Sequence, residues 1–374
     1  MTAKPVTALR RWTARIAPAL LMAGALCAEL PAARAAEPAP FNAGMRMGAI
    51  PYRQVSMPIA LTYPTRAEAA LRDFGPYRMT IAMGASAAPA PAAGWPVVFV
   101  SHGTGGSLLG HADMVAALAR AGYVVVMLEH PGDNYRDRSL VADARYFSER
   151  PAQLRALLQA FLDRDGAAGA AAGGLLGDLR IGASRVALIG HSAGGYTAAV
   201  VAGASGNVQR VIDHCAANAG ADPMCALADP NVSVAPGMAG PRYQLAADAP
   251  MPASAADPRV RAAILLAPLT VPLQPESLGS LRPALMVITA AADELLVPRF
   301  HGAPWAAMAP RATLQIEPRA GHYSFMTSLP AERRAMLAQA GTDPAGFERG
   351  PFQRELAARI IGFLDRTTAP RGAP

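Results

Sequence analysis

The chain lacks several features that define whole classes of protein. Only 16% of its 374 residues are charged and 6% are aromatic, and no lysine follows Lys4. The arginines are scattered without runs, so the sequence has no basic patch of the kind that binds nucleic acid. Hydrophobic residues make up 52% of the chain, which is enough for a substantial core. We therefore expect a globular protein that does not bind nucleic acid.

The first 35 residues have the pattern of a secretory signal peptide. Lys4 and three arginines precede a short apolar segment over 16–26, and Ala33-Arg34-Ala35 fits a small-residue cleavage site. The apolar segment is too short to span a bilayer, so no stable membrane span is expected. Removal of residues 1–35 leaves 29 basic and 26 acidic residues, a net charge of +3. We expect an exported mature protein over 36–374, periplasmic or secreted.

Cysteine is scarce, with three residues in all, and Cys27 lies in the predicted signal peptide. Cys215 and Cys225 remain, ten residues apart across a segment that contains proline and glycine. In an oxidising compartment this pair predicts a disulfide, which would contribute about 2–3 kcal/mol. A metal site that includes the adjacent His214 is the alternative, although a fourth ligand with suitable spacing is missing.

From about residue 95, short apolar runs alternate with longer helical patterns. The runs "WPVVFVSHG", "YVVVMLEHPG", "RVALIG", "RAAILLAPL", "ALMVITAAADE" and "ATLQIEP" predict strands. Helices are predicted between them and at the end of the chain, over 107–122, 148–165, 298–310 and 351–366. Continuous apolar strands separated by helices require a parallel sheet covered on both faces. The sequence therefore predicts an α/β fold with a mostly parallel central sheet.

Three further segments complete the predicted organisation. Residues 45–85 are expected to supply one to three antiparallel edge strands. The Ala/Gly-rich stretch 165–178 is expected to be a surface loop with a little helix. The segment at about 206–257 is a long insertion, and insertions of this length are often functional, so we expect it to cap a site. With no repeat and no second boundary, residues 36–374 are interpreted as one domain.

Residues 190–194, Gly-His-Ser-Ala-Gly, lie between a predicted strand and a run that can form a helix. An abrupt turn from strand to helix strains the central residue, and the glycines permit close packing of strand and helix. The turn would hold the Ser192 hydroxyl near the positive end of a helix dipole. A phosphate loop would need a lysine after the glycines, and a dinucleotide fingerprint would need G-x-G-x-x-G; neither is present. The pattern predicts that Ser192 is a nucleophile.

A serine nucleophile needs a base and a carboxylate that orients the base. In this kind of fold they follow in the order serine, acid, histidine. Outside the insertion, only His301 and His322 follow Ser192. His301 lies in a predicted helix, whereas His322 follows a predicted strand and is the expected base. Asp293 stands just beyond another strand and is the expected acid, with its neighbour Glu294 as the alternative.

Acyl transfer also needs hydrogen-bond donors for the oxyanion, and the loss of one donor costs about 10²- to 10³-fold in turnover. The backbone N–H of Ala193 is the first expected donor. The second is expected from the backbone of Thr104, in a loop where three glycines let the chain approach the substrate. His102 in the same loop is expected to brace the loop rather than act as a base.

With these residues in hand, the sequence resembles the α/β-hydrolase superfamily over about residues 45–366. More narrowly, it resembles an exported bacterial group labelled predicted dienelactone hydrolases, which is similar to platelet-activating-factor acetylhydrolases. The resemblance rests on "FVSHGTGGS", "LEHPGDNYRD", "GHSAGGYTA", "RAGHYSF" and the loop between the cysteines. True dienelactone hydrolases use a cysteine where this chain has Ser192. The acetylhydrolases place the acid after the strand that here ends in "LLAPLT". The resemblance therefore implies serine ester hydrolysis, but it implies neither the dienelactone nor the lipid substrate.

The combined prediction is an exported serine hydrolase that cleaves small-molecule or lipid-like carboxylic esters through an acyl-enzyme, with no metal or organic cofactor. The loop "EHPGDNYRD" and the insertion at about 206–257 are expected to form the walls of its pocket. Two alternatives stay open. The first is another acyl-transfer activity on the same residues: a lipid acetylhydrolase, polyester depolymerase, peptidase, thioesterase or acyltransferase. The second is a non-catalytic binding protein built on a hydrolase scaffold.

Overall fold

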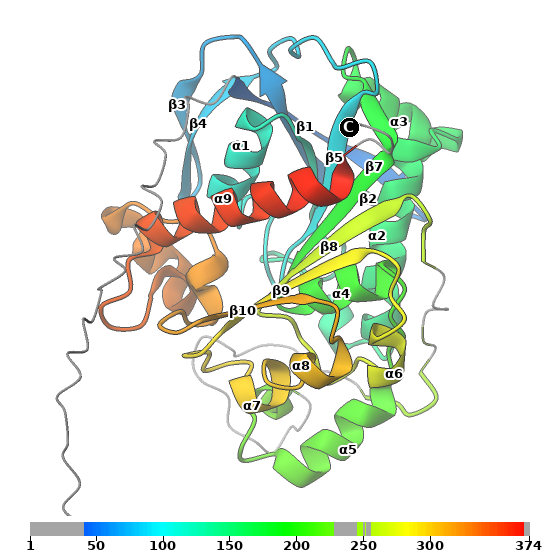
Figure 1. Ribbon diagram of the computed structural model, residues 1–374, viewed down its shortest axis with the longest axis vertical. Coiled ribbons are helices and arrows are strands. Elements are labelled where there is room, and N and C mark those ends of the chain that lie inside the picture. The colour runs from blue at the N-terminus through cyan, green and yellow to red at the C-terminus, as the bar shows by residue number, and fades with distance from the viewer. Residues whose placement is uncertain (1–40, 228–244, 250, 252–255, 370–374) are drawn as a thin grey trace, which may run out of the picture. The chain divides into compact units, whose positions relative to one another are not determined.

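A mixed sheet, with ten strands among the described residues, forms the centre of the fold (Figure 1). The computed structural model describes residues 41–227, 245–249, 251 and 256–369. The strands lie in the order β10-β9-β8-β7-β5-β6-β2-β1-β4-β3. The predicted signal peptide, 1–35, and residues 228–244, 250 and 252–255 of the predicted insertion lie outside the described part of the chain.

Six neighbouring strands form the parallel part of the sheet. They are β5 (Trp95–Ser101), β6 (Val124–Leu128), β7 (Ile181–His191), β8 (Val260–Leu266), β9 (Ala284–Ala290) and β10 (Thr313–Glu317). Every residue of β5 and β6 is buried. A strand buries both of its faces only when other elements cover both sides of the sheet. The predicted α/β fold with a mostly parallel sheet is confirmed.

The N-terminal edge of the sheet differs from the prediction. Residues 42–83 form four strands rather than one to three: β1 (Asn42–Tyr52), β2 (Val55–Thr65), β3 (Ala70–Phe74) and β4 (Tyr77–Met83). Three of the pairings are antiparallel, but β1 and β4 pair in parallel. In β3 four residues are exposed and the fifth is half-buried, so the alternating pattern that identifies a strand is missing from its sequence.

Helices cover both faces of the sheet, as the two sides of Figure 1 show. On one face lie α1 (Ala112–Arg120) and α9 (Arg349–Thr368); on the other lie α2 (Tyr146–Leu162), α3 (Gly166–Leu176) and α4 (Ala193–Val201). The side chains of β5 alternate between the two cores. Val97 and Phe99 pack with α2 and α4, and Val98 and Val100 pack with α1 and α9.

Helix α3 corrects the prediction of a surface loop over 165–178. Eleven residues of this stretch, Gly166–Leu176, are helical, and the helix packs against β1 and α2. Alanine is the best helix former, and the buried Ala172 and Leu176 attach the helix to the core. The glycines hid this tendency, because glycine lowers helix propensity as much as alanine favours it.

The remaining helices are short. They are α5 (Val208–Asn218), α6 (Pro275–Leu278), α7 (Pro298–His301), α8 (Trp305–Met308) and the 3₁₀ helices η1 (Ser139–Ala142), η2 (Pro223–Leu227), η4 (His322–Phe325) and η5 (Ala331–Gly341). The single helix predicted over 298–310 is thus two helices, α7 and α8. In the described part of the chain no helix has both the length and the apolar character needed to cross a bilayer.

Helix α2 contains a proline beyond its first turn. Pro151 is the sixth residue of the helix and has no N–H to donate to the carbonyl of Phe147, four residues earlier. The hydroxyl of Tyr196, on α4, donates a hydrogen bond to this carbonyl at 2.9 Å. A side chain of the neighbouring helix therefore replaces the missing backbone donor and joins α2 to α4.

This replacement predicts coupling between Tyr196 and Pro151. Tyr196→Phe should cost about 1–2 kcal/mol in the free energy of unfolding, because a buried carbonyl loses its donor. In a Pro151→Ala background the new N–H of residue 151 can donate to Phe147, so the same change should cost less. Urea denaturation of the four proteins of this double-mutant cycle measures the difference. Equal losses in both backgrounds would contradict the interpretation.

Candidate active site

Ser192 occupies the turn between β7 and α4 in a strained backbone conformation, with φ 59° and ψ −122°. Positive φ is rare for residues other than glycine and persists only where the surroundings impose it. A Cβ on Gly190 would lie 2.0 Å from the carbonyl oxygen of Gly194, and a Cβ on Gly194 would lie 2.0 Å from that of Ser101. The glycines therefore allow β7, β5 and α4 to meet closely, and the turn lifts Ser192 out of the sheet.

The structure brings Ser192, His322 and Asp293 together in one chain of hydrogen bonds. Ser192 Oγ lies 2.9 Å from His322 Nε2, and His322 Nδ1 lies 2.8 Å from Asp293 Oδ2. All three side chains are buried. The other carboxylate oxygen, Asp293 Oδ1, accepts the backbone N–H groups of Leu295 and Leu296 at 2.9 and 2.7 Å.

Of the two neighbouring acids, Asp293 contacts the histidine and Glu294 is exposed. Both Asp293 and His322 lie on segments that follow strand ends, after β9 and β10 respectively. Since β7, β9 and β10 are parallel, their carboxyl ends lie at one edge of the sheet, and residues after them can converge.

Two further histidines fix the segment that begins with His322. Nε2 of His191 donates to the carbonyl oxygen of His322 at 3.0 Å, and Nδ1 of His111 donates to that of Phe325 at 3.1 Å. The 3₁₀ helix that begins at His322 is thus fixed at both ends by buried imidazoles. Neither histidine belongs to a sequence motif that predicts this role.

The two expected oxyanion donors lie beside Ser192. Ala193 is the first residue of α4, and the preceding Gly103 brings Thr104 near, because a Cβ on Gly103 would lie 3.0 Å from Ser192 Cβ. Within the described residues, the backbone N–H groups of Ala193 and Thr104 donate to no protein acceptor. Both are therefore available to a ligand atom next to the hydroxyl of Ser192.

A fully buried ion pair supports the loop that carries Thr104. Arg150 and Asp133 have no exposed side-chain surface and contact each other through Nη1 and Oδ2. Asp133 Oδ1 accepts the N–H of Gly105 at 2.7 Å, and Arg150 Nη2 donates to the carbonyl of His102. Tyr146 adds a link, since its hydroxyl contacts Asp133 Oδ2 at 3.1 Å and Thr104 Oγ1 at 2.7 Å. Helix α2 thus fixes the loop through polar contacts on both sides of Thr104.

Loss of Arg150 should be costly. Arg150→Met would leave Asp133 buried without its cation, and breaking a buried pair in this way costs about 3–5 kcal/mol. The matched change Arg145→Met, at an exposed pair with Asp143, should leave stability nearly unchanged. Urea denaturation of both variants compares the two pairs. A small loss for Arg150→Met would show that this ion pair does not support the loop.

Four buried histidines surround the site as neutral groups. Burial, with the nearby charge of Arg150, lowers the pKa of His102 to about 3, and burial lowers the pKa of His111 to about 4. Burial also lowers the pKa values of His130 and His191 well below their usual range. His102 Nδ1 donates to the carbonyl of Gly103 at 2.7 Å, and its Nε2 accepts the N–H of His130 at 3.1 Å. His102 therefore braces the loop, as expected.

These histidines predict acid sensitivity. Their pKa values are lower in the folded protein than the unfolded value near 6.5, so below that pH the unfolded chain binds more protons. The stabilising effect is complete above about pH 6.5 and is lost as pH falls toward the folded values. Between pH 6.5 and 5 His102 and His111, with folded pKa values of about 3 and about 4, should each remove up to about 2 kcal/mol. Urea denaturation across this interval tests the prediction, with His111→Gln expected to show a shallower decline. A flat profile would contradict it.

Ser192 and His322 open onto a cavity of about 860 Å³. The predicted loop 129–137 contributes Glu129, Tyr135 and Arg136 to its wall. The described part of the insertion contributes Met224, from η2. The cavity is also lined by residues outside the predicted walls, namely Met47, Tyr77, Met326 and residues 336–340.

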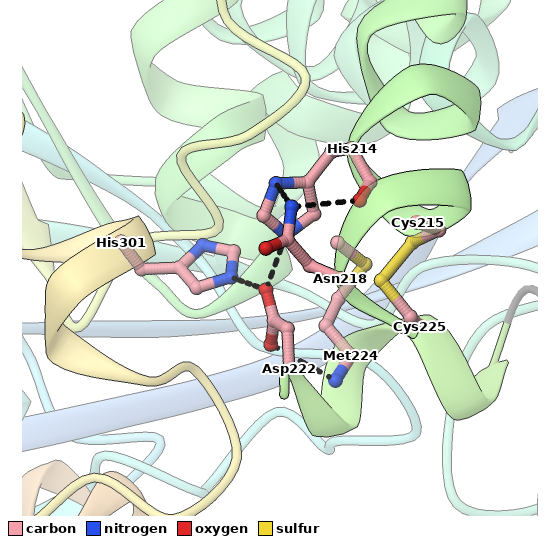
Figure 2. Close-up of a disulfide and its surroundings, with 7 residues drawn as sticks. All are labelled: His214, Cys215, Asn218, Asp222, Met224, Cys225 and His301. Atoms are coloured by element: carbon pink, nitrogen blue, oxygen red, sulfur yellow. Dashed lines mark hydrogen bonds and ion pairs between the residues drawn. A yellow bond between two sulfur atoms is a disulfide. The ribbon is translucent and has the colours of Figure 1, made fainter. Parts of the chain in front are cut away.

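The cysteines form the predicted disulfide, which joins α5 to η2 (Figure 2). Beside it, one oxygen of Asp222 accepts hydrogen bonds from Nε2 of His214 at 2.8 Å and from Nε2 of His301 at 3.0 Å. His301 Nδ1 accepts the backbone N–H of Thr270 at 3.1 Å, so the ring proton lies on Nε2.

This arrangement bears on the metal alternative for the cysteine loop. Cys225 Sγ, His214 and Asp222 offer ligand atoms within 4.8 Å of one another, but the sulfur is bonded to Cys215. The proton on His301 Nε2 leaves that nitrogen no lone pair for a cation. The geometry is that of a polar cluster in which Asp222, just before η2, joins His214 of α5 to His301 of α7, rather than that of a metal centre.

Comparison with known proteins agrees with the fold. Residues 97–337 match the model of the alpha/beta hydrolase family, so the chain belongs to this family. Comparison with curated protein sequences gives no match. Among solved structures, the chain is similar to a ferulic acid esterase from Streptomyces cinnamoneus, with a TM-score of 0.53 and 19% identity. The likeness covers 91% of this chain and 94% of the esterase, and it shows a shared fold. The predicted α/β-hydrolase fold is confirmed.

Proposed function

We propose that this protein is a serine hydrolase that cleaves carboxylic esters through an acyl-enzyme intermediate. The observation that carries the proposal is the buried chain of hydrogen bonds from Asp293 through His322 to Ser192, at the wall of a large cavity. Membership of the alpha/beta hydrolase family and the fold shared with an esterase support it.

In the first half of the reaction His322 acts as the general base. Its Nε2 takes the proton of Ser192 Oγ while this oxygen attacks the ester carbonyl carbon. The carbonyl oxygen becomes an oxyanion, and the backbone N–H groups of Ala193 and Thr104 stabilise it. Asp293 Oδ2 accepts a hydrogen bond from the protonated Nδ1 of His322. This bond fixes the tautomer of the imidazole and stabilises the imidazolium. His322 then gives its proton to the leaving alcohol, and the acyl group stays on Ser192.

In the second half water replaces the alcohol. His322 Nε2 takes a proton from the water, whose oxygen attacks the acyl carbon, and a second oxyanion forms beside the same two donors. Collapse of this intermediate releases the carboxylic acid, and the proton on His322 returns to Ser192 Oγ. The cycle consumes one water and needs no cofactor.

We further propose that the protein is exported and belongs to the group labelled predicted dienelactone hydrolases. The signal-peptide pattern over 1–35 and the Cys215–Cys225 disulfide, which favours an oxidising compartment, support export. The motifs around Ser192 and His322 support the group. The mature domain is 36–374, with the insertion at about 206–257 as its cap, and the position of Met224 at the cavity wall agrees with that role.

Labelling with a fluorophosphonate tests the catalytic assignment. Intact mass should reveal one adduct on the native protein, none on Ser192→Ala and strongly slowed labelling on His322→Ala. Asp293→Asn should lower ester turnover by about 10⁴-fold, because the wrong imidazole tautomer is favoured. Glu294→Gln is the matched control and should retain full activity. A folded native protein without an adduct would overturn the proposal in favour of a binding protein on a hydrolase scaffold.

A further inference from the structure

Among the residues that the structure describes, one charged side chain at the cavity has no partner. Arg138 lies in the segment between β6 and η1, and no hydrogen bond or ion pair within the described residues involves its guanidinium. Arg138 as a whole is half-buried, but its Nε is buried and has no acceptor among the described residues. Removing a charged donor from water without pairing it is unfavourable, so natural proteins pair such groups with a residue or with a ligand.

The neighbouring charges that face the cavity are already paired. Arg136 donates through Nη2 to Glu129 at 2.5 Å, which neutralises the buried carboxylate of Glu129. His102, His111 and His191 are neutral at physiological pH, as described above. Among the described cavity residues Arg138 therefore supplies the uncompensated charge, and it is positive.

Arg138 lies beside the loop that carries Thr104. A Cβ on Gly105, one residue after Thr104, would be 3.4 Å from Arg138 Nε and 3.7 Å from its Cζ. On the other side, the charge of Arg138 acts on Tyr323, the residue after His322. Burial and the charge of Asp293 raise the pKa of the Tyr323 phenol, and Arg138 opposes this rise. The guanidinium thus lies beside the oxyanion loop, at the cavity that Ser192 and His322 also line.

A guanidinium matches a carboxylate in both charge and geometry, since its planar fork can donate two parallel hydrogen bonds. We propose that Arg138 forms an anion-binding subsite, and that the substrates are acidic esters with a carboxylate within a few bonds of the scissile carbonyl. The subsite rests on the proposed function, because its value to catalysis depends on Ser192 being the nucleophile. Gln339, whose buried Oε1 also has no partner among the described residues, lines the same cavity, but a neutral amide does not select charge.

Matched pairs of esters test the subsite. In the first pair the acyl chain differs: p-nitrophenyl hydrogen glutarate is anionic and p-nitrophenyl methyl glutarate is neutral. In the second pair the alcohol differs: 4-acetoxybenzoate is anionic and methyl 4-acetoxybenzoate is neutral. The native protein should prefer the anionic member of at least one pair, and the pair that responds tells on which side of the ester the anion binds.

Arg138→Gln should lower kcat/KM for the preferred anionic ester by about 10- to 100-fold, which corresponds to the loss of a hydrogen bond to a charged group. Its kcat/KM for the neutral partner should change by less than about twofold. Arg138→Lys should keep part of the preference, because it retains the charge but loses the fork. Arg145→Gln, which removes an equal charge outside the cavity, should leave the preference unchanged. Equal effects of Arg138→Gln on both members of each pair would overturn the subsite.

Calorimetry with monomethyl glutarate separates this proposal from the catalytic one. The anion should bind the Ser192→Ala protein, and Arg138→Gln in that background should weaken binding at least about tenfold. Absence of ester hydrolysis together with Arg138-dependent binding would contradict the proposed function and leave the subsite intact. Hydrolysis of neutral esters with no Arg138-dependent binding would overturn the subsite alone.

Discussion

The close contact between the ends of β5 and β7 and the start of α4 is the constraint on which the site depends. Gly190 and Gly194 leave no space for a Cβ, so the strand must turn at once into the helix and Ser192 must adopt a positive φ. This single turn positions both the hydroxyl of Ser192 and the N–H of Ala193. The other groups of the site, on segments after β5, β9 and β10, reach Ser192 because parallel strands end at one edge of the sheet.

The parts of the site that follow local rules were predictable from the sequence. Ser192 is identified by glycines at fixed spacing between a strand and a helix, and His322 and Asp293 by their order and their positions after strands. The parallel strands were equally clear, because runs such as residues 97–100 are buried on both faces. In each case the physical cause lies within a few residues of its effect, so a short stretch of sequence contains it.

Features that depend on distant contacts were not predictable. The role of Arg150 requires Asp133 and the carbonyl of His102, and these three residues come from separate segments. The helix α3 is stabilised by packing that its Ala/Gly-rich sequence does not reveal, and β3 is a strand only because β4 pairs with it. That Arg138 has no partner in the described part of the chain is a property of the folded cavity. Such features arise when residues far apart in the chain meet, and a linear pattern does not contain them.

Two different kinds of interaction fix the wall of the cavity at Met224, a disulfide and hydrogen bonds to a carboxylate. The neighbouring Cys225 is bonded to α5, and the N–H of Met224 itself donates to Asp222, whose other oxygen binds the imidazole of His301 (Figure 2). A reductant breaks the disulfide but leaves the hydrogen bonds of Asp222. Protonation of Asp222 weakens these hydrogen bonds but leaves the disulfide. We therefore expect the cavity wall at Met224 to keep its position when only the redox potential or only the pH changes.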